Sequence, residues 1–189
     1  TSEAVTSAAT GSVENVNDVP SGTVMIEGEA KEDEVLTASN DLLDEDGLGE
    51  FGYQWKRGGN NISGATASSY TPGQSDVGEV ITVAASYTDG EGTSEAVTSA
   101  ATGSVENVND TGSVAISGAL TQGEQLSASV SDGDGISGVT VSYQWQESSD
   151  EGLNWSDIAG ATTMTYTLGQ SEVGKTLKVT ASYTDAEGT

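Results

Sequence analysis

The sequence predicts an all-β fold in which antiparallel β-sandwiches follow one another in tandem. Three observations lead to this prediction. The segment Thr1–Asp18 returns letter for letter as Thr93–Asp110, an offset of 92 residues (position 1 to position 93), which is about the size of an immunoglobulin-like domain. Apolar and polar residues alternate with a period of two along several short segments, as in half-buried strands. No segment keeps the period of an amphipathic helix.

Two copies of the repeat align along most of the chain. The matching blocks are Tyr53–Trp55 with Tyr143–Trp145, Gly64–Thr66 with Gly160–Thr162, Gly73–Gly78 with Gly169–Gly174, and Ala85–Asp89 with Ala181–Asp185. The second copy holds six more residues between its Tyr-Gln-Trp and Gly-Ala-Thr blocks, around Trp155. We expect an extended hairpin with Trp155 folded onto the sheet. A platform for stacking a sugar is the alternative role for this side chain.

Alternation predicts the strands of each copy. The inward positions of the most regular strand are Ile81, Val83, Ala85 and Tyr87 in the first copy and Leu177, Val179, Ala181 and Tyr183 in the second. Another strand offers Phe51, Tyr53 and Trp55, and its counterpart offers Val141, Tyr143 and Trp145. Shorter strands are expected around Val24 and Ile26, Leu36 and Ala38, Tyr70, Val114 and Ile116, Leu126 and Ala128, and Tyr166. About seven strands per copy, with a core tryptophan on the third, predict an immunoglobulin-like sandwich.

The repeat boundaries divide the chain into three parts. Residues 1–18 are expected to be the last strand (strand G) and linker of a preceding repeat. Residues 19–110 would be a complete repeat with its linker, and residues 111–189 a second repeat without its last strand. Because Thr1–Asn15 has the sequence of that strand, we expect it to add to the second repeat of another molecule, head to tail.

Composition argues against several classes of function. The 30 acidic and 5 basic residues give a formal charge of −25, so nucleic acid, whose phosphates need Lys and Arg, is not an expected partner. Cysteine and histidine are absent, which removes thiolate metal sites and the commonest general base. No hydroxyl nucleophile has an identifiable base, so we expect no enzyme. No apolar run has the length of a membrane span, and membrane insertion is not expected.

The charge itself requires an explanation, because a compact chain this acidic repels itself. One explanation is a disordered chain, which high charge and few aromatic residues can produce. The other is a folded chain whose clustered carboxylates are neutralised by cations. The regular strand pattern favours the folded, cation-binding alternative.

The ordered set of blocks resembles a known group of proteins. These blocks look like the immunoglobulin-like, cadherin-like tandem repeats from the extender region of giant RTX-type bacterial adhesins. They are YQW, GAT, GQS-VG, ASYTD, SEAVTSA and ENVND. The resemblance implies a calcium-rigidified spacer on the bacterial cell surface, exported by type I secretion and partnered by neighbouring repeats of its own chain. ENVND is similar to the Asp- and Asn-rich linker of cadherins, but has Glu and Asn where more Asp would be expected.

The strands of such a sandwich are lettered A to G in chain order. The loops after the second strand (B) and the sixth strand (F) lie at the end where the first strand (A) starts, so three acidic segments are predicted to meet at one end of each repeat. Calcium takes six to eight oxygen ligands, and carboxylate, Asn and carbonyl oxygens could supply them there. The predicted calcium ligands in the second repeat are Asn107, Asn109, Asp110, Asp132, Asp134, Asp185 and Glu187. At the front of the first repeat they are Asn15, Asn17, Asp18, Asp44, Asp46, Asp89 and Glu91, with Asp41 as the alternative to Asp46.

Other interpretations of the acids stay open. They could be ordinary solvated turn residues, since Asp is favoured in turns for conformational reasons. An EF-hand is excluded, because the fifth position from Asp44 is Leu48 and that from Asp132 is Ile136. Four acids are expected at the opposite end, solvated rather than part of a site shared with a following domain: Asp76, Glu172, Glu32 and Glu124.

Two functional hypotheses follow. The first is the calcium-rigidified extender, in which the tandem repeats hold a distal ligand-binding domain away from the cell. The second is a module that binds a glycan or protein, or a non-catalytic arm of a secreted enzyme. Calcium-specific thermal stabilisation would favour the first, and an exposed aromatic cluster would favour the second.

Overall fold

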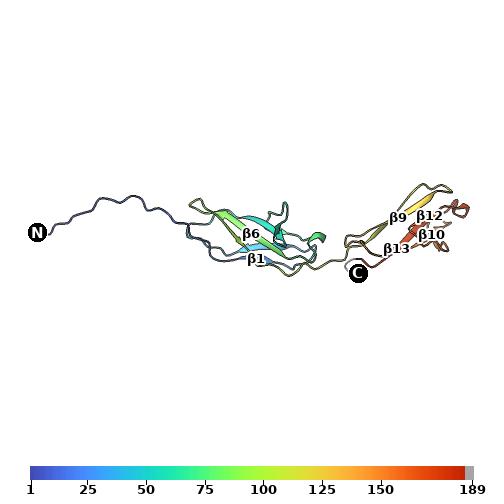
Figure 1. Cartoon of the computed structure of the whole chain (residues 1–189), viewed down its shortest axis with the longest axis horizontal. Helices are drawn as coiled ribbons and strands as arrows, with labels where there is room; N and C mark the ends of the chain where they lie inside the picture. Colours follow the sequence, from blue (N-terminus) through green and yellow to red (C-terminus); the bar gives the residue numbers. More distant parts are fainter. Residues whose placement is uncertain (186–189) are drawn as a thin grey trace. The chain divides into compact units, whose positions relative to one another are not determined.

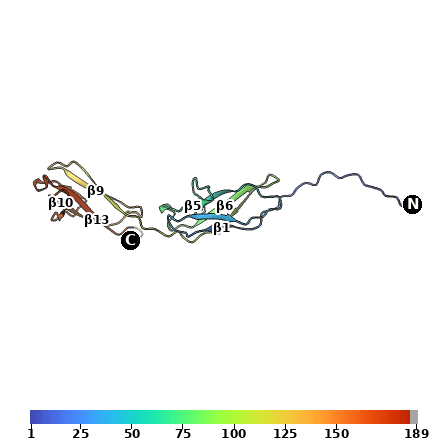
Figure 2. The ribbon, with the colours of Figure 1, turned by 180° about the vertical axis from the view of Figure 1, so that it is seen from behind.

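The computed structural model describes residues 1–185 and is all-β. The chain forms two compact units, unit 1 (residues 1–106) and unit 2 (residues 107–189), and each is a sandwich of two antiparallel sheets of the immunoglobulin-like kind (Figures 1 and 2). The helical elements among residues 1–185 are the 3-10 turns η1 (Gln74–Asp76) and η2 (Gln170–Glu172). Neither is long or apolar enough to cross a membrane.

Unit 1 pairs a three-stranded sheet, in the order β1-β2-β5, with a four-stranded sheet, in the order β4-β3-β6-β7. The strands are β1 (Val24–Glu27), β2 (Leu36–Asn40), β3 (Gly52–Arg57), β4 (Asn60–Asn61), β5 (Ser69–Tyr70), β6 (Ile81–Thr88) and β7 (Ser94–Thr98). Trp55 lies opposite Val83, and Ala85 lies opposite Val97. The inward face predicted for β6 is confirmed, because Ile81, Val83, Ala85 and Tyr87 are all buried.

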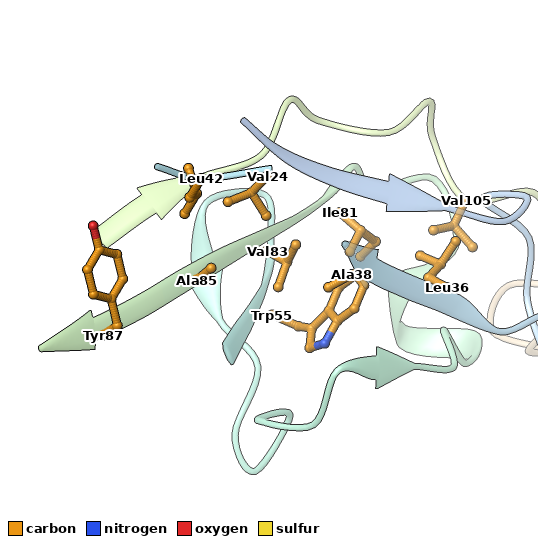
Figure 3. Close-up of a cluster of buried hydrophobic side chains, with 10 residues drawn as sticks. All are labelled: Val24, Leu36, Ala38, Leu42, Trp55, Ile81, Val83, Ala85, Tyr87 and Val105. Carbon is orange, nitrogen blue, oxygen red and sulfur yellow. The ribbon is translucent and has the colours of Figure 1, made fainter. Parts of the chain in front are cut away.

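The core of unit 1 packs around Trp55, as predicted. This side chain is fully buried, and its indole Nε1 donates a hydrogen bond to the Ala67 carbonyl at 2.9 Å. Figure 3 shows the buried cluster, with Tyr87 at one end and Val105 at the other. Val105 is 2% exposed, although it stands in a Gly- and Ser-rich stretch after β7. The core therefore extends into a segment whose sequence gives no alternating signal.

Unit 2 repeats this plan in the sheets β8-β9-β12 and β11-β10-β13. Its strands are β8 (Ser113–Ser117), β9 (Gln125–Ser131), β10 (Ser142–Ser148), β11 (Ser156–Asp157), β12 (Thr165–Thr167) and β13 (Thr176–Ser182). Trp145 is fully buried, and its Nε1 donates to the Thr163 carbonyl at 2.9 Å. Within residues 107–185, no strand pairs with the outer edge of β13.

The six-residue insertion lengthens the β10–β11 hairpin, as predicted. Asp150 organises the longer loop, because its Oδ1 accepts from the Ser148 hydroxyl at 2.6 Å and from the Asn154 amide at 2.9 Å. These bonds lower the pKa of Asp150 to about 2, the Ser148 bond most of all. Asp150 thus holds the longer loop through hydrogen bonds within the loop itself.

The front segment, residues 1–17, contains no helix or strand, and all of its side chains are exposed. The identical sequence at Ser94–Thr98 forms β7. The second copy of this sequence pairs along the edge of β6.

Candidate functional site

Acidic residues from three segments lie at the end of unit 1 where β6 finishes. The Asp46 amide donates to Asp44 Oδ1 at 2.9 Å, and the Asp18 amide donates to Asp46 Oδ2 at 2.7 Å. The Gly90 amide donates to the Asp46 carbonyl at 2.9 Å, which joins the loop after β6 to the same turn. The structure thus brings together the segments of Asp18, Asp44 with Asp46, and Asp89.

Asp89 is the most buried of these carboxylates, at 6% exposed. Its Oδ1 accepts from the Glu91 amide at 2.9 Å and from the Thr93 amide at 2.7 Å, which fixes the tight turn into β7. Its Oδ2 is buried and has no hydrogen-bond partner among residues 1–185. A buried anionic oxygen without a donor is unfavourable, and a bound cation would compensate it.

A buried tyrosine lies among the carboxylates at this end of unit 1. Tyr87 donates its hydroxyl hydrogen bond to Asp44 Oδ2. Burial raises the pKa of Tyr87, and the bond to Asp44 and the negative charges of Asp44, Glu95 and Asp89 raise it further. The phenol is therefore held neutral among carboxylates, in surroundings that would attract a cation.

Unit 2 builds the same arrangement from the equivalent residues. The Asp134 amide donates to Asp132 Oδ1 at 3.0 Å, and the Asp110 amide donates to Asp134 Oδ2 at 2.7 Å. Tyr183 donates to Asp132 Oδ2. That bond, then burial, then the charges of Asp132, Asp185 and Asp134 raise the pKa of Tyr183 to about 12. Asp134 and Asp185 are both buried.

The remaining predicted ligands differ in placement. Asn17 donates its side-chain amide to Glu95 at 2.9 Å, and Asn107 Oδ1 is buried without a partner among residues 1–185. Asp41 accepts from the Thr23 amide at 2.6 Å, so that Asp46 rather than Asp41 stands beside Asp44. Asn15, Glu91 and Asn109 are exposed, and Glu187 lies outside the described residues.

The carboxylates alone do not form a preassembled metal centre. Within residues 1–185, no group of three or more Asp or Glu residues has a geometry that could hold a metal ion. A calcium ion at the acidic end of unit 1 or of unit 2 would therefore also be coordinated by Asn side-chain and backbone carbonyl oxygens, which are ordinary calcium ligands.

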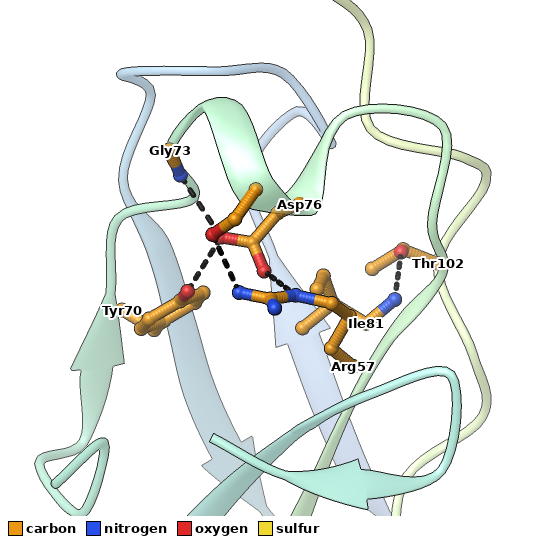
Figure 4. A network of polar contacts seen from close by, with 7 residues as sticks. Arg57, Tyr70, Gly73, Asp76, Ile81 and Thr102 are labelled. Atoms are coloured by element: carbon orange, nitrogen blue, oxygen red, sulfur yellow. Dashed lines mark hydrogen bonds and ion pairs between the residues drawn. The ribbon is translucent and has the colours of Figure 1, made fainter. Parts of the chain in front are cut away.

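The prediction that the acids of the opposite end are solvated is wrong for Asp76, Glu172 and Glu32, which are buried, while Glu124 is exposed. Asp76 is 1% exposed and accepts from Arg57 Nε at 2.6 Å, from the Tyr70 hydroxyl at 2.6 Å and from the Gly73 amide at 2.9 Å (Figure 4). Burial raises its pKa, but the bonds from Tyr70, Gly73 and Arg57 outweigh burial and lower the pKa below the ordinary value. Sequence reasoning missed this structural network, although the shared GQS-acid block marked the position.

Unit 2 holds its buried acid with a different partner set. Glu172 accepts from the Gly169 amide and from the Ser171 hydroxyl, each at 2.7 Å. The position of Arg57 is taken by Glu147, which pairs with Lys175 at 2.7 Å, and both of these side chains are about a quarter exposed. The bond from Ser171 lowers the pKa of Glu172 most, burial opposes it, and the Gly169 amide adds to the lowering.

Trp155 lies folded onto the sheet, as predicted. The Lys178 ammonium, on β13, stands 4.5 Å from the centre of its ring. A Cβ placed on Gly152 would come within 3.3 Å of the ring, so the turn backbone packs closely against it. A sugar would have to displace these neighbours to stack on Trp155, which argues against a glycan platform there.

Comparison with known proteins gives a family match over part of the chain and a distant likeness to solved structures. Residues 110–186 match a family described as a domain of unknown function (DUF8696). No curated protein matches significantly. Among solved structures, the three N-terminal domains of the bacteriophage RB49 Highly Immunogenic Outer Capsid protein (Hoc) are similar at 16% identity and a TM-score of 0.34. The alignment covers 85% of this chain and 58% of that one, so the chain spans just over half of its length. The sheets of the two units make this protein an all-β chain of immunoglobulin-like sandwiches.

Proposed function

We propose that this chain is a calcium-stiffened spacer from the extender region of a bacterial surface adhesin, and that it catalyses no reaction. Its immunoglobulin-like units would hold a distal ligand-binding domain away from the cell. Three features support the proposal: two units of one repeat in series, a formal charge of −25, and carboxylates gathered at the equivalent end of each unit. The resemblance of the SEAVTSA and ENVND blocks to RTX-type adhesin repeats adds the extracellular location and export by type I secretion.

The main support for the calcium proposal is that Asp89 Oδ2 is buried without a hydrogen-bond partner among the described residues. Asp89 Oδ2 and Asn107 Oδ1 are the buried side-chain oxygens that lack a partner among residues 1–185. Both residues belong to the ligand sets that strand order predicts. Oxygens of this kind are the ligands that calcium uses, and a cation would remove the unfavourable burial of an unpaired anion.

In each unit, calcium would bind oxygens from segments that hydrogen bonds already join. In unit 1, Asp18, Asp44, Asp46 and Asp89 would hold the ion; in unit 2, Asn107, Asp110, Asp132, Asp134 and Asp185 would hold it. The bound ion would supply positive charge that offsets the repulsion among these side chains. Loss of calcium would leave that repulsion uncompensated and loosen the segments on which the carboxylates lie.

Calcium at unit 2 would also restrict the linker segment. The Glu106 amide donates to the Ala30 carbonyl in unit 1, and the Asp110 amide donates to Asp134 in unit 2. Only Asn107, Val108 and Asn109 lie between these two attachments. Binding of Asn107 to an ion held by unit 2 would restrict this three-residue segment further, and so reduce its freedom to bend.

Thermal unfolding tests the proposal, recorded in chelator, in calcium and in magnesium. Extracellular calcium sites typically bind at about 10⁻⁴ to 10⁻³ M, so 10 mM calcium would stabilise each unit by roughly 1.4 to 2.7 kcal/mol. For units of this size we expect the midpoint to rise by about 5 to 15 °C, with a much smaller effect of magnesium. No calcium-specific rise would show that the acids are ordinary solvated turn residues.

A pair of matched variants places the site. Asp89→Asn should remove most of the calcium-dependent rise of unit 1, because it takes one negative charge from the carboxylate end. Asp33→Asn makes the same change on an exposed loop, where the Asp33 amide bonds the Pro72 carbonyl near Asp76, and should leave the rise intact. If both variants kept the full rise, Asp89 would not be a ligand.

A further inference from the structure

Each unit joins its core to its carboxylate end through one tyrosine. Tyr87 is the last inward-facing residue of β6, and Tyr183 stands at the equivalent position directly after β13. Tyr87 is buried, and its ring packs edge-on against Phe51, with the two ring centres 5.2 Å apart. Figure 3 shows Tyr87 at one end of the buried cluster. The ring therefore belongs to the core, while the hydroxyl reaches the acids.

The Asp44 carboxylate of unit 1 is held at both of its oxygens. The Tyr87 hydroxyl donates to Oδ2, and the Asp46 amide donates to Oδ1 at 2.9 Å. An ionised carboxylate has about four lone pairs, so each oxygen keeps a lone pair with which a cation could be bound. The two donors come from different elements, β6 and the loop after β2. Together they fix the orientation of the carboxylate.

Unit 2 repeats this arrangement and makes room for it with a glycine. Tyr183 donates to Asp132 Oδ2, and the Asp134 amide donates to Asp132 Oδ1 at 3.0 Å. A Cβ placed on Gly112 would overlap both the Tyr183 hydroxyl oxygen and Asp132 Oδ2. The φ angle of Gly112 is not positive, so this position requires glycine for its small size. The same bond therefore forms in both copies, although the two acidic loops differ in sequence.

A separate observation marks the same end of unit 1 as a place for a cation. Asp89 follows Tyr87 by two residues and is 6% exposed, and its Oδ2 has no hydrogen-bond partner among residues 1–185. The Gly90 amide donates to the Asp46 carbonyl at 2.9 Å, which joins the loop of Asp89 to the loop of Asp44. A cation that compensated Asp89 would therefore meet a carboxylate whose orientation Tyr87 already holds.

We propose that Tyr87 and Tyr183 are positioning residues for calcium, which hold Asp44 and Asp132 in the orientation that binds the ion. The inference rests on the proposed calcium function and adds a determinant of affinity in the core of each unit. The phenols would not touch the ion, because each hydroxyl hydrogen is donated to a carboxylate. A ligand that is already ordered loses less conformational freedom when the ion binds.

A positioning role differs measurably from a purely structural one. A bond that only holds the loop would lower the stability of the metal-free chain and leave its affinity for calcium unchanged. A positioning bond sets the affinity itself, because without it calcium binding must also order the carboxylate. Loss of a hydrogen bond to a metal-binding group typically weakens metal binding about 10- to 100-fold.

Isothermal titration calorimetry of the whole chain with calcium chloride tests the proposal. Tyr87→Phe/Tyr183→Phe removes both hydroxyls and keeps the rings that the cores contain. Tyr53→Phe/Tyr143→Phe is the matched control, because these half-buried tyrosines pack against the same two cores. The first pair should raise the dissociation constant for calcium about 10-fold or more, and the second should leave it unchanged. Circular dichroism in chelator should show that both variants keep the fold.

Near-ultraviolet absorption gives a second measurement, on the wild-type chain as well as on the variants. A calcium ion would draw electron density from the two carboxylates and so weaken the hydrogen bonds that they accept from the phenols. Calcium should therefore shift the tyrosine band to shorter wavelength, and magnesium should shift it much less. The calcium-dependent shift should persist in Tyr53→Phe/Tyr143→Phe and disappear in Tyr87→Phe/Tyr183→Phe.

The outcomes separate this inference from the calcium function on which it rests. If the wild-type chain bound no calcium, both would be refuted. If the wild-type and Tyr87→Phe/Tyr183→Phe chains bound calcium equally tightly, the calcium sites would stand and the tyrosines would have only a structural role. Equal weakening by both tyrosine pairs would also overturn the positioning role, because the loss would then come from a loosened core rather than from the missing bonds.

Discussion

Units 1 and 2 are copies of one repeat, yet they finish their cores differently. In unit 1, Val105 closes one end of the core and Ile81 is fully buried. In unit 2, the equivalent Leu177 is half-buried, and Leu120 and Val173 stand exposed beside an open groove. The burial of Val105 and its bonds to Gly78 and Glu79 make the stretch after β7 part of the folded unit 1.

The two units also differ in how they hold the buried acid at this end. Each acid is bonded by a phenol, from Tyr70 or Tyr166, and by a backbone amide, but Asp76 also receives a guanidinium, where Glu172 receives the Ser171 hydroxyl. Unit 2 has the negatively charged Glu147 where unit 1 has the positively charged Arg57. Lys175, in the loop before β13, forms an ion pair with Glu147. The same backbone therefore tolerates an exchange of charges, provided that each acid keeps its donors.

The largest expected effect comes from removing the closing residue of unit 1. Val105→Asp should destabilise unit 1 by about 3 kcal/mol or more, because it loses a buried valine and places a charge in the core. Unit 2 should unfold as before. Calorimetry of the whole chain measures this as a separate, lowered transition. Val13→Asp alters the same sequence block where the side chain is exposed, and an equal loss of stability in that variant would refute the comparison.

A smaller effect should separate the two buried acids. Asp76→Asn should destabilise unit 1 by about 2 to 3 kcal/mol, because hydrogen bonds to a charged, buried group are weakened or lost. Glu172→Gln is the matched change in unit 2 and should cost less, since no guanidinium is left without its partner there. Denaturant unfolding followed by tryptophan fluorescence measures both. A greater loss for Glu172→Gln would reverse this ranking of the networks.

Acid should weaken both units through these same carboxyls. The pKa values of Asp76 and Glu172 are lowered in the folded state, so the unfolded state binds more protons as the pH falls. Their contribution is complete above the ordinary values, about 3.8 and 4.5, and is lost as the pH falls through the lower folded values. Thermal midpoints measured from pH 6 to pH 2 should fall, and Asp76→Asn should flatten the fall for unit 1. An unchanged pH profile in that variant would show that other carboxyls control it.

The smallest effect belongs to the exposed ion pair of unit 2. Lys175→Met should change stability by less than about 1 kcal/mol, because both partners are about a quarter exposed and solvent screens the pair. Arg57→Met is the matched change in unit 1 and should cost more, since it leaves the buried Asp76 carboxylate with one donor fewer. Urea unfolding of the two variants measures the contrast. Equal losses would show that burial of the acid does not distinguish the pairs.

Alternation in the sequence was sufficient to predict the sheets, because each strand of a sandwich buries every second residue. Trp55, Trp145 and the inward face of β6 could therefore be placed from pattern alone. Val105 could not, because it is a single apolar residue in an irregular stretch and its burial depends on contacts with Ala30, Gly78 and Glu79. The burial of Asp76 was not predicted for a related reason: a lone acid in a turn is expected to be solvated, and the sequence does not show that Arg57 and Tyr70 bond it.

The acidic ends were predicted more closely than the interior networks. Strand order alone placed Asp18, Asp44 and Asp89 on neighbouring segments, because loop positions in a sandwich follow from topology. It could not give the tyrosine hydrogen bonds to Asp44 and Asp132, which depend on the inward face of β6 and β13 reaching the end of the sheet. The identity and number of bound ions stay predictions.

The segment that contains Val105 should also be the first part of unit 1 to respond to a pulling force. A load pulling unit 1 at its entry and exit would act first on the backbone bonds that tie Glu106 to Ala30 and Glu32. Once these rupture, Val105 leaves the core and residues 99–106 become extended chain of about 26 to 29 Å, and the unit lengthens by the part of this that they did not already span, before β7 itself is strained. Under load, unit 1 would thus yield in a short first step that leaves its sheets intact, and single-molecule force spectroscopy would see that step vanish in Val105→Asp.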